Sequence, residues 1–241
     1  MSLVNVHTHS FYDDLIEPGA TILDLGANVG KFAGLMTDGY HCRCVALEPA
    51  PNAFDQIPTS ASIDRHNVAV SGERGEVVLN LSTNSEANSL GKTADFDYHD
   101  AVRVQAVTLA DALKLAGADR VALLKLDIEG SEIDVLGGAG PDLLRRFDQI
   151  TAEFHDFCGI TPRPVVRETV RKVRDAGFHV FYFDRDVYRY ADVLFVNRRR
   201  MSSLRYAAEM ARLWGPRVVT SAWRRITRRN QAPPMQDSEA A

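Results

Sequence analysis

Residues 21–30 read TILDLGANVG, and residues 43–49 read RCVALEP. In the first segment an apolar run containing Asp24 leads into a glycine-bearing turn. The second segment is another apolar run, and it ends at Glu48, twenty-four residues after Asp24. A strand, a glycine turn, a helix and a second strand that ends in an acid form the first βαβ unit of a Rossmann-like sheet. These segments therefore predict an α/β fold with a nucleotide-binding corner.

The residue types in this corner indicate the ligand. Gly26 and Gly30 lack a Cβ, which lets the backbone turn sharply and lets a ligand approach closely. Glu48, at the end of the second strand, is placed to accept hydrogen bonds from both hydroxyls of a ribose. Because position 28 is Asn, the Gly-x-Gly-x-x-Gly pattern of dinucleotide sites is missing, and the chain has no P-loop lysine pattern. Asp24 suits a cationic group such as an ammonium, and ribose plus ammonium indicates S-adenosylmethionine.

Four segments in this order resemble the FkbM-type S-adenosylmethionine-dependent methyltransferases. They are residues 24–30, Glu48-Pro49, residues 67–71 (NVAVS) and residues 124–132 (LKLDIEGSE), and the resemblance spans about residues 18–197. It implies a Rossmann-like class I methyltransferase fold, whose mostly parallel seven-stranded sheet has an antiparallel last strand. It also implies methyl transfer, usually to an oxygen of a sugar or a natural-product scaffold.

The expected cofactor is therefore S-adenosylmethionine, and its site is expected within these segments. The resemblance places residues 67–69 near the adenine, although an ordinary strand with a polar entry is the alternative there. The expected cofactor-binding residues are Asp24, Gly26, Ala27, Asn28, Gly30, Glu48, Pro49, Asn67, Val68, Ala69 and Asp127.

The catalytic candidates are Asp127, His155 and Glu153, which follow predicted strands at the carboxyl edge of the sheet. Methyl transfer to a hydroxyl requires alignment and removal of a proton. His155 is the first candidate base because imidazole titrates near neutral pH, and a local hydrogen bond is its alternative role. A carboxylate at the end of an apolar strand needs a partner, which favours a site role for Asp127. Glu153 could orient His155, contact a substrate hydroxyl or form a salt bridge.

A metal ion is a further option at this edge. Asp127, Glu129 and Glu132 form an acidic cluster that suits a divalent cation, but oxygen ligands at this spacing are too common to assign Mg²⁺. Lys125 lies within the apolar run of residues 121–126, just before Asp127, and is interpreted as structural.

The N-terminal sequence Val6-His7-Thr8-His9 is open to two interpretations. A His-x-His pair is typical of metal-dependent hydrolases of the amidohydrolase type. However, the chain is short for the eight-fold barrel of these hydrolases, and the glycine turn and Glu48 would remain unexplained. We therefore expect residues 1–17 to form an arm or short helix. Its side chains His7, His9, Phe11 and Tyr12 would cover the cofactor or the acceptor.

The rest of the pattern predicts alternating strands and helices. The last two strands must be antiparallel, because the short link between them cannot make a parallel crossover. Thr108 and Asp111 form a capping box at a helix start. The expected strands are 21–25, 43–48, 65–70, 77–81, 102–107 (an inserted hairpin with 76–81), 121–126, 149–154, 178–183 and 191–196; the expected helices are 30–38, 51–57, 108–116, one from 131, one from 141, and 164–176; residues 82–101 are expected to be a loop.

Charge divides the chain. Residues 198–241 carry ten arginines and three acidic residues, which leaves 18 basic and 29 acidic residues in 1–197. Apolar residues recur among these arginines at near-helical spacing, as in segments that bind a membrane surface, an anionic substrate or a protein partner. Helices that pack on the acidic body with a solvated basic face are the alternative. The expected domains are the arm (1–17), a methyltransferase domain (18–197), a basic amphipathic helical extension (198–230) and a disordered tail (231–241).

Composition narrows the function. The acidic body lacks basic strands interleaved with aromatic residues, which argues against nucleic acid as a partner. Since no apolar run reaches the length of a membrane span and no signal peptide opens the chain, we expect a cytoplasmic protein, with peripheral contact at the inner membrane surface through its extension. The expected activity is O-methylation of a carbohydrate, glycolipid or natural-product scaffold. An N-methyltransferase and a non-catalytic cofactor-binding module with an interaction tail are the alternatives.

Overall fold

The computed structural model describes residues 2–82, 88–90, 98–154, 162–183 and 192–214. The chain divides into two compact units at Arg200, and the second unit begins at Met201. In the second unit, residues 203–214 form a helix. The remainder of the predicted extension and the predicted disordered tail lie outside the described residues, so both stay predictions.

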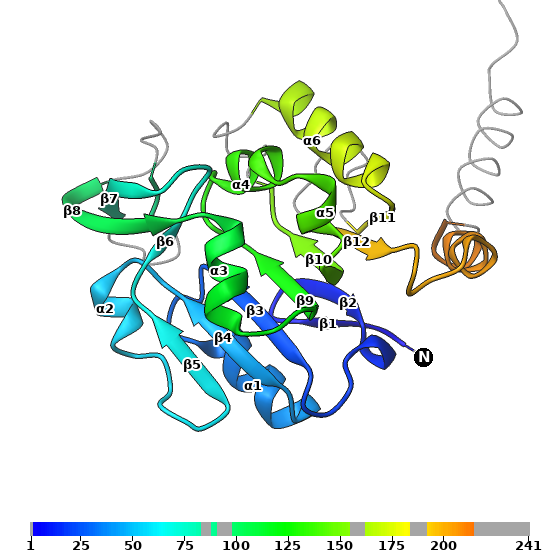
Figure 1. The fold of residues 1–241 in the computed structure, drawn as a ribbon, viewed down its shortest axis with the longest axis horizontal. Coiled ribbons are helices and arrows are strands. Elements are labelled where there is room, and N and C mark those ends of the chain that lie inside the picture. Colours follow the sequence, from blue (N-terminus) through cyan, green and yellow to red (C-terminus); the bar gives the residue numbers. More distant parts are fainter. Residues whose placement is uncertain (1, 83–87, 91–97, 155–161, 184–191, 215–241) are drawn as a thin grey trace, which may run out of the picture. The chain divides into compact units, whose positions relative to one another are not determined.

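A seven-stranded sheet forms the centre of the first unit (Figure 1). Its strand order is β11-β12-β10-β9-β3-β4-β5. All neighbouring strands run parallel except β12, which is antiparallel to both β10 and β11. The predicted sheet and its antiparallel last strand are therefore confirmed. The strands are β3 (Thr21–Leu25), β4 (Arg43–Leu47), β5 (Ile63–His66), β9 (Val121–Leu126), β10 (Phe147–Ala152), β11 (Phe178–Tyr182) and β12 (Val193–Asn197).

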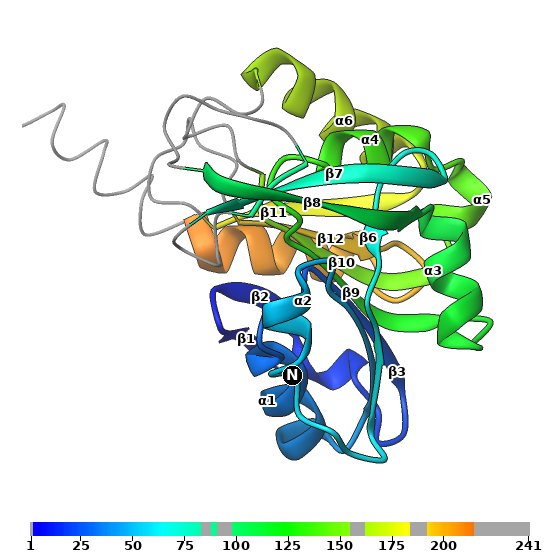
Figure 2. The ribbon, with the colours of Figure 1, turned by 90° about the vertical axis from the view of Figure 1, so that its left-hand side faces the viewer.

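Helices cover both faces of this sheet, with α1 and α3 on opposite sides (Figure 2). Side chains alternate along each strand, so one face carries Leu23, Leu25, Val45 and Leu47, which pack with the apolar residues of α3, α4 and α6 in one core. The predicted capping box starts α3. The helices are α1 (Lys31–Tyr40), α2 (Pro51–Phe54), α3 (Leu109–Ala116), α4 (Glu132–Gly138), α5 (Pro141–Leu144) and α6 (Arg163–Asp175).

A second sheet of three strands, in the order β6-β8-β7, follows β5 in the chain. Strands β7 (Gly75–Ser82) and β8 (Tyr98–Val107) form the predicted inserted hairpin. The predicted strand 65–70 is divided, since its end is β6 (Ala69–Val70), which pairs with β8. The predicted loop 82–101 is too long, because β8 begins at Tyr98. Within it, Ser89 forms a bridge with Asn80 on β7.

The predicted N-terminal arm contains a β-hairpin, and its helical part is limited to three residues. Strand β1 (Leu3–Val6) pairs with β2 (His9–Tyr12), and a 3₁₀ helix η1 (Asp13–Leu15) follows. Strand β2 is buried and contacts β10 and β12. The side-chain amide of Gln149 on β10 satisfies both backbone polar groups of Tyr12. Its Oε1 accepts from Tyr12 N (2.8 Å), and its Nε2 donates to Tyr12 O (3.0 Å). Phe11 and Tyr12 are therefore core residues and do not cover a ligand.

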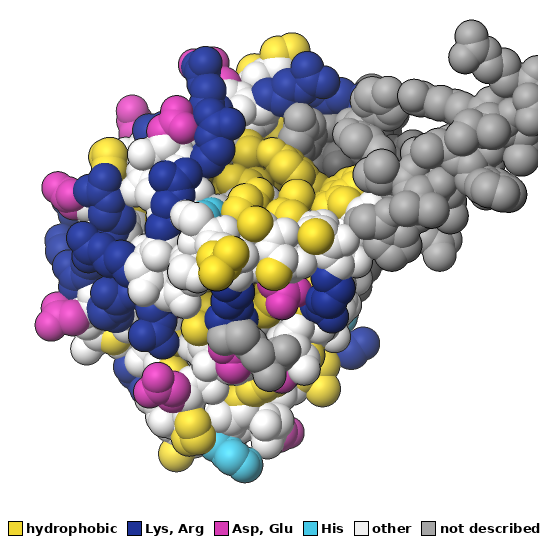
Figure 3. All heavy atoms as spheres, turned by 90° about the vertical axis from the view of Figure 1, so that its right-hand side faces the viewer, with side chains coloured by type: hydrophobic (Ala, Val, Ile, Leu, Met, Phe, Trp, Pro, Cys, Tyr) yellow, Lys and Arg dark blue, Asp and Glu magenta, His cyan; other side chains and the backbone are white. Residues whose placement is uncertain are grey.

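The surface is uneven in charge. On the face shown in Figure 3, many Lys and Arg side chains gather beside exposed hydrophobic ones. Helix α6 buries Val166, Val170 and Val173 and exposes its arginines. Among the described residues, no helix has both the length and the apolar character needed to cross a membrane.

Candidate active site

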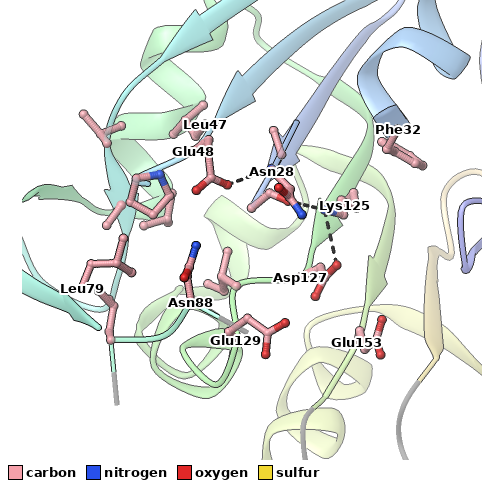
Figure 4. Close-up of a pocket in the computed structure, with 18 of the residues that line it drawn as sticks. Asn28, Phe32, Leu47, Glu48, Leu79, Asn88, Lys125, Asp127, Glu129 and Glu153 are labelled. Carbon is pink, nitrogen blue, oxygen red and sulfur yellow. Dashed lines mark hydrogen bonds and ion pairs between the residues drawn. The ribbon is translucent and has the colours of Figure 1, made fainter. Parts of the chain in front are cut away.

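A pocket of about 250 Å³ lies at the carboxyl ends of β3, β4 and β9 (Figure 4). One side, which we call the β3–β4 side, carries Asn28 and Glu48. The opposite side, the β9–β10 side, carries Asp127 and Glu153. The residues that line the pocket are His7, Thr8, Gly26, Ala27, Asn28, Phe32, Leu47, Glu48, Pro49, Val68, Ala69, Val70, Leu79, Asn88, Leu90, Lys125, Asp127, Ile128, Glu129 and Glu153.

On the β3–β4 side, the backbone holds the carboxylate of Glu48. Its Oε2 accepts a hydrogen bond from Asn28 N (2.8 Å), and its Oε1 accepts one from Ala50 N (2.8 Å). Asn28 adopts φ +48, a left-handed conformation that Asn tolerates better than most residues. Burial raises the pKa of Glu48, although the hydrogen bonds from Ala50 and Asn28 oppose that shift. The acid predicted for the ribose therefore has a fixed orientation.

At Gly26 and Gly30, the two glycines of the turn, other segments of the chain pack closely against the backbone. Both have φ +76, so the predicted sharp turn is confirmed. A Cβ on Gly26 would lie 1.8 Å from Asp127 O, and one on Gly30 would lie 2.8 Å from side-chain atoms of Ile57 and Pro58. Gly26 also lines the pocket, whereas Gly30 does not. The space left by the missing Cβ atoms, which was expected to admit a ligand, is therefore filled largely by neighbouring segments of the chain.

Asp24 lies behind the pocket wall, where it is fully buried and does not line the pocket. Its cationic partner is Lys125, whose Nζ is 3.2 Å from Asp24 Oδ1 and 3.6 Å from Asp127 Oδ2, and donates to Gly26 O (2.5 Å). Burial alone would lower the pKa of Lys125, but the charges of Asp24 and Asp127 outweigh it and raise that pKa. Lys125, interpreted from the sequence as structural, also lines the pocket.

Asn67 supports the pocket from outside. Its Nδ2 donates to Glu48 O (2.8 Å) and Pro49 O (3.1 Å), and it does not line the pocket. Val68 and Ala69 do line it, as the sequence predicted. Together with Leu79 they belong to an apolar part of the wall.

On the β9–β10 side, the ends of two adjacent strands bring Asp127 and Glu153 together. Glu153 N donates to Leu126 O (3.0 Å), which continues the pairing of the strands past their ends. His9 reaches this place from β2, with its Nε2 3.5 Å from Asp127 Oδ2 and its ring edge-on to Phe32 at 5.7 Å between centroids. Burial lowers the pKa of His9, against a raising influence of Asp127. The predicted base, His155, lies outside the described residues.

The acidic cluster expected from Asp127, Glu129 and Glu132 does not form. Glu132 is fully buried, and its carboxylate accepts hydrogen bonds from Ile128 N (2.9 Å) and Gly130 N (3.0 Å). It therefore closes the turn that follows β9. Glu129 lines the pocket at φ +53, and its carbonyl accepts from Ser89 Oγ (2.7 Å).

The sequence pattern did not identify Lys125 as a member of the site, and it placed His9 on a covering arm without linking it to Asp127. A signal for Lys125 existed, because Asp24 and Lys125 are charged residues in apolar strands and are direct partners in the sheet register. His9 carried no comparable signal. Its place depends on a hairpin whose turn residues, His7 and Thr8, both have positive φ without being Gly or Asn.

Comparison with known proteins gives a consistent result. A family model described as "Methyltransferase FkbM domain" matches residues 24–180. Methyltransferase sdnD of Sordaria araneosa is 30% identical over 181 residues, which are 59% of this chain and 69% of that protein. The 31-O-demethyl-FK506 methyltransferase FkbM of Streptomyces tacrolimicus is 29% identical over 203 residues, 68% of this chain and 75% of that protein. The structure of Aeropyrum pernix fibrillarin with bound S-adenosyl-L-methionine is 15% identical and covers 75% of this chain and 66% of that chain, with a TM-score of 0.42, too low to carry an argument.

Proposed function

The chain belongs to the FkbM methyltransferase family and is a methyltransferase that uses S-adenosylmethionine; on this premise, we propose that it methylates a hydroxyl oxygen. The acceptor class that we propose is a carbohydrate, a glycolipid or a natural-product scaffold. The relative from Streptomyces tacrolimicus supports oxygen as the acceptor atom, since its name describes a 31-O-demethyl substrate. The observation that carries the proposal is the pair of carboxylates, Asp127 and Glu153, on the pocket wall opposite Glu48.

The β3–β4 side fits the cofactor. Glu48 lines the pocket with an orientation fixed by two backbone N–H groups, so it can accept from ribose hydroxyls without reorganising. Val68 and Ala69 offer an apolar surface that suits a flat base. The backbone of Gly26, Ala27 and Asn28 and the ring of Pro49 complete this side. S-adenosylmethionine supplies an electrophilic methyl group on a sulfonium, which becomes a neutral thioether when the methyl is transferred.

Three of the predicted cofactor residues act indirectly in this proposal. Asp24 fixes Lys125 at the pocket wall through the 3.2 Å ion pair. Gly30 provides the left-handed N-cap of α1. Asn67 binds the carbonyls of Glu48 and Pro49 and so fixes the strand end that presents the ribose acid.

The β9–β10 side handles the acceptor. Attack by a hydroxyl oxygen on the methyl carbon requires that the hydroxyl proton leave, and a carboxylate oxygen of Asp127 or Glu153 is the group that takes it. Lys125 Nζ lies 3.6 Å and His9 Nε2 lies 3.5 Å from Asp127 Oδ2, so both side chains face the Asp127 carboxylate. His155, which lies outside the described residues, stays a proposed base.

Matched acceptors test the proposal. Purified full-length protein is incubated with S-adenosylmethionine and with pairs of sugars and polyketide alcohols that differ only in carrying a hydroxyl or an amine at one carbon. Formation of S-adenosylhomocysteine and of methylated acceptor is followed by mass spectrometry. We expect methylation of hydroxyl members only. Methylation of the amines alone would assign N-methyl transfer. Cofactor binding without turnover of any pair would favour the non-catalytic module.

A further inference from the structure

His9, Asp127 and Glu153 meet at one point of the pocket wall. One ligand atom from each of them lies within 4.8 Å of the other two. They come from three different elements, namely β2, the end of β9 and the end of β10. Strands β9 and β10 are neighbours in the central sheet, and β2 is a buried strand of the hairpin that contacts β10. All three give the rigid support that a preorganised site needs.

The imidazole of His9 is buried and directed at this point. The residue is 1% exposed, and its Nε2 has no hydrogen-bond partner within the usual geometry among the described residues. The atom it faces is Asp127 Oδ2, at 3.5 Å. Burying a polar ring nitrogen without a partner is costly, so this nitrogen calls for a ligand between it and the carboxylates.

The charges of the cluster fit a divalent cation. Lys125 Nζ lies 3.2 Å from Asp24 Oδ1 and 3.6 Å from Asp127 Oδ2, so its single positive charge is shared between the two acids. Asp127 and Glu153 then bring two negative charges to the point that His9 faces. Two carboxylates and one imidazole supply two negative charges and three metal-ligand atoms, which is a ligand set that suits a divalent metal ion.

We propose that His9, Asp127 and Glu153 bind a divalent transition-metal ion of the Mn²⁺ class. The imidazole disfavours Mg²⁺ and Ca²⁺, which take oxygen ligands almost exclusively, whereas Mn²⁺ accepts carboxylates and imidazole together. This set differs from the cluster expected from the sequence, because only Asp127 is common to both.

The pocket gives the ion access to the acceptor. Asp127 and Glu153 line the pocket, so an ion that they held would be accessible to an acceptor bound in the pocket. A hydroxyl oxygen bound there would lose its proton more easily to a neighbouring carboxylate oxygen. This catalytic role rests on the proposed O-methyl transfer, whereas the metal site itself does not.

Titration of the full-length protein with Mn²⁺ tests the site. The protein is treated with a chelator and dialysed, and free Mn²⁺ is then measured by its electron paramagnetic resonance signal. We expect saturable binding of one ion. His9→Ala and Glu153→Gln should each weaken Mn²⁺ binding by at least about tenfold. His99→Ala, which removes an exposed imidazole on β8, should bind as the wild type does.

S-adenosylmethionine binding shows that each variant is folded. A His9→Ala protein that keeps the cofactor affinity of the wild type but loses Mn²⁺ binding would support the proposal. Wild-type protein that leaves free Mn²⁺ undiminished would overturn it, as would equal Mn²⁺ binding by His9→Ala. Loss of turnover in His9→Ala without Mn²⁺ binding by the wild type would assign His9 to proton handling instead. Mn²⁺ binding without methylation of any hydroxyl would refute the proposed function and leave the metal site standing.

Discussion

The two sides of the pocket are built in different ways. On the β3–β4 side, backbone N–H groups hold the key carboxylate, Glu48, and all the parts lie within one continuous stretch of chain. On the β9–β10 side, side chains surround the key carboxylate, Asp127, since Lys125 Nζ and His9 Nε2 both lie within 3.6 Å of its Oδ2. His9 comes from the opposite end of the domain sequence.

This difference indicates a division of labour. A carboxylate fixed by backbone groups keeps its geometry whatever the neighbouring side chains are, which suits recognition of an invariant cofactor. A carboxylate contacted by side chains from two elements, β2 and β9, can be retuned by single substitutions, which suits adaptation to a particular acceptor. If this account is correct, changes on one side should affect cofactor binding, and changes on the other should affect turnover.

The largest effect is expected from Asp127→Asn on the β9–β10 side. Because the amide cannot take a proton, turnover should fall by about 10²–10⁴-fold. Affinity for S-adenosylmethionine should change by less than about tenfold. Steady-state kinetics and calorimetric titration measure the two quantities. Asp119→Asn, at an exposed carboxylate paired with Arg146, is the matched control and should change neither. Equal losses of affinity and turnover would show that the two sides are not separable.

Gly26→Ala should be strongly destabilising, because it affects the contact between the two sides. The new Cβ would meet Asp127 O at 1.8 Å and would impose φ +76 on an alanine. The free energy of unfolding should fall by about 2–5 kcal/mol, from backbone strain and overpacking together. Gly39→Ala, in helix α1 with nothing near its Cβ, should instead raise it by up to about 1 kcal/mol. Urea denaturation measures both, and similar values for the two variants would refute the packing argument.

Glu48→Gln probes the β3–β4 side alone. The variant keeps an oxygen for one backbone N–H but loses the charge that strengthens hydrogen bonds from ribose hydroxyls, an effect of about 1.5–3 kcal/mol. Affinity for S-adenosylmethionine should therefore fall by about 10–150-fold, while turnover at saturating cofactor stays near that of the wild type. Glu76→Gln, at a surface ion pair with Arg103, is the control. A fall in saturated turnover with unchanged affinity would contradict the division of labour.

The smallest expected effect is the pH dependence that Glu48 gives to stability and to cofactor affinity. The pKa of Glu48 is raised above its ordinary value of 4.5 by burial, so Glu48 takes up a proton at a higher pH in the folded protein than in the unfolded chain. The stability that Glu48 contributes is present below its unfolded pKa and is lost as pH rises through the folded pKa. Cofactor affinity has the opposite trend and should decline as pH falls through the raised pKa, since the protonated acid accepts fewer hydrogen bonds. Titrations from pH 8 to pH 5 measure the slope, which Glu48→Gln should remove.

The β3–β4 side could be predicted from the sequence because its signals are local. The glycine turn and Glu48 are close in the chain, and each residue type has few other uses in that setting. The alternation of strands and helices predicted the sheet for the same reason. What local signals could not give was which atoms fill the space beside Gly26, because that depends on Asp127, far along the chain.

The β9–β10 side could be predicted only in part. Asp127 and Glu153 stood at strand ends and were recognised. His9 was assigned to an arm, because the hairpin turn at His7 and Thr8 lacks the Asn or Gly that is typical of such turns. Lys125 was interpreted as structural, since its pairing with Asp24 becomes visible only once the strand register is known.

Calorimetric titration of the full-length protein with S-adenosylmethionine and, in parallel, with NAD tests the central claim most directly. The claim is that the pocket between the two sides binds S-adenosylmethionine, with the ribose at Glu48. We predict saturable binding of one S-adenosylmethionine per chain and no measurable binding of NAD. No binding of S-adenosylmethionine, or tighter binding of NAD, would contradict the account.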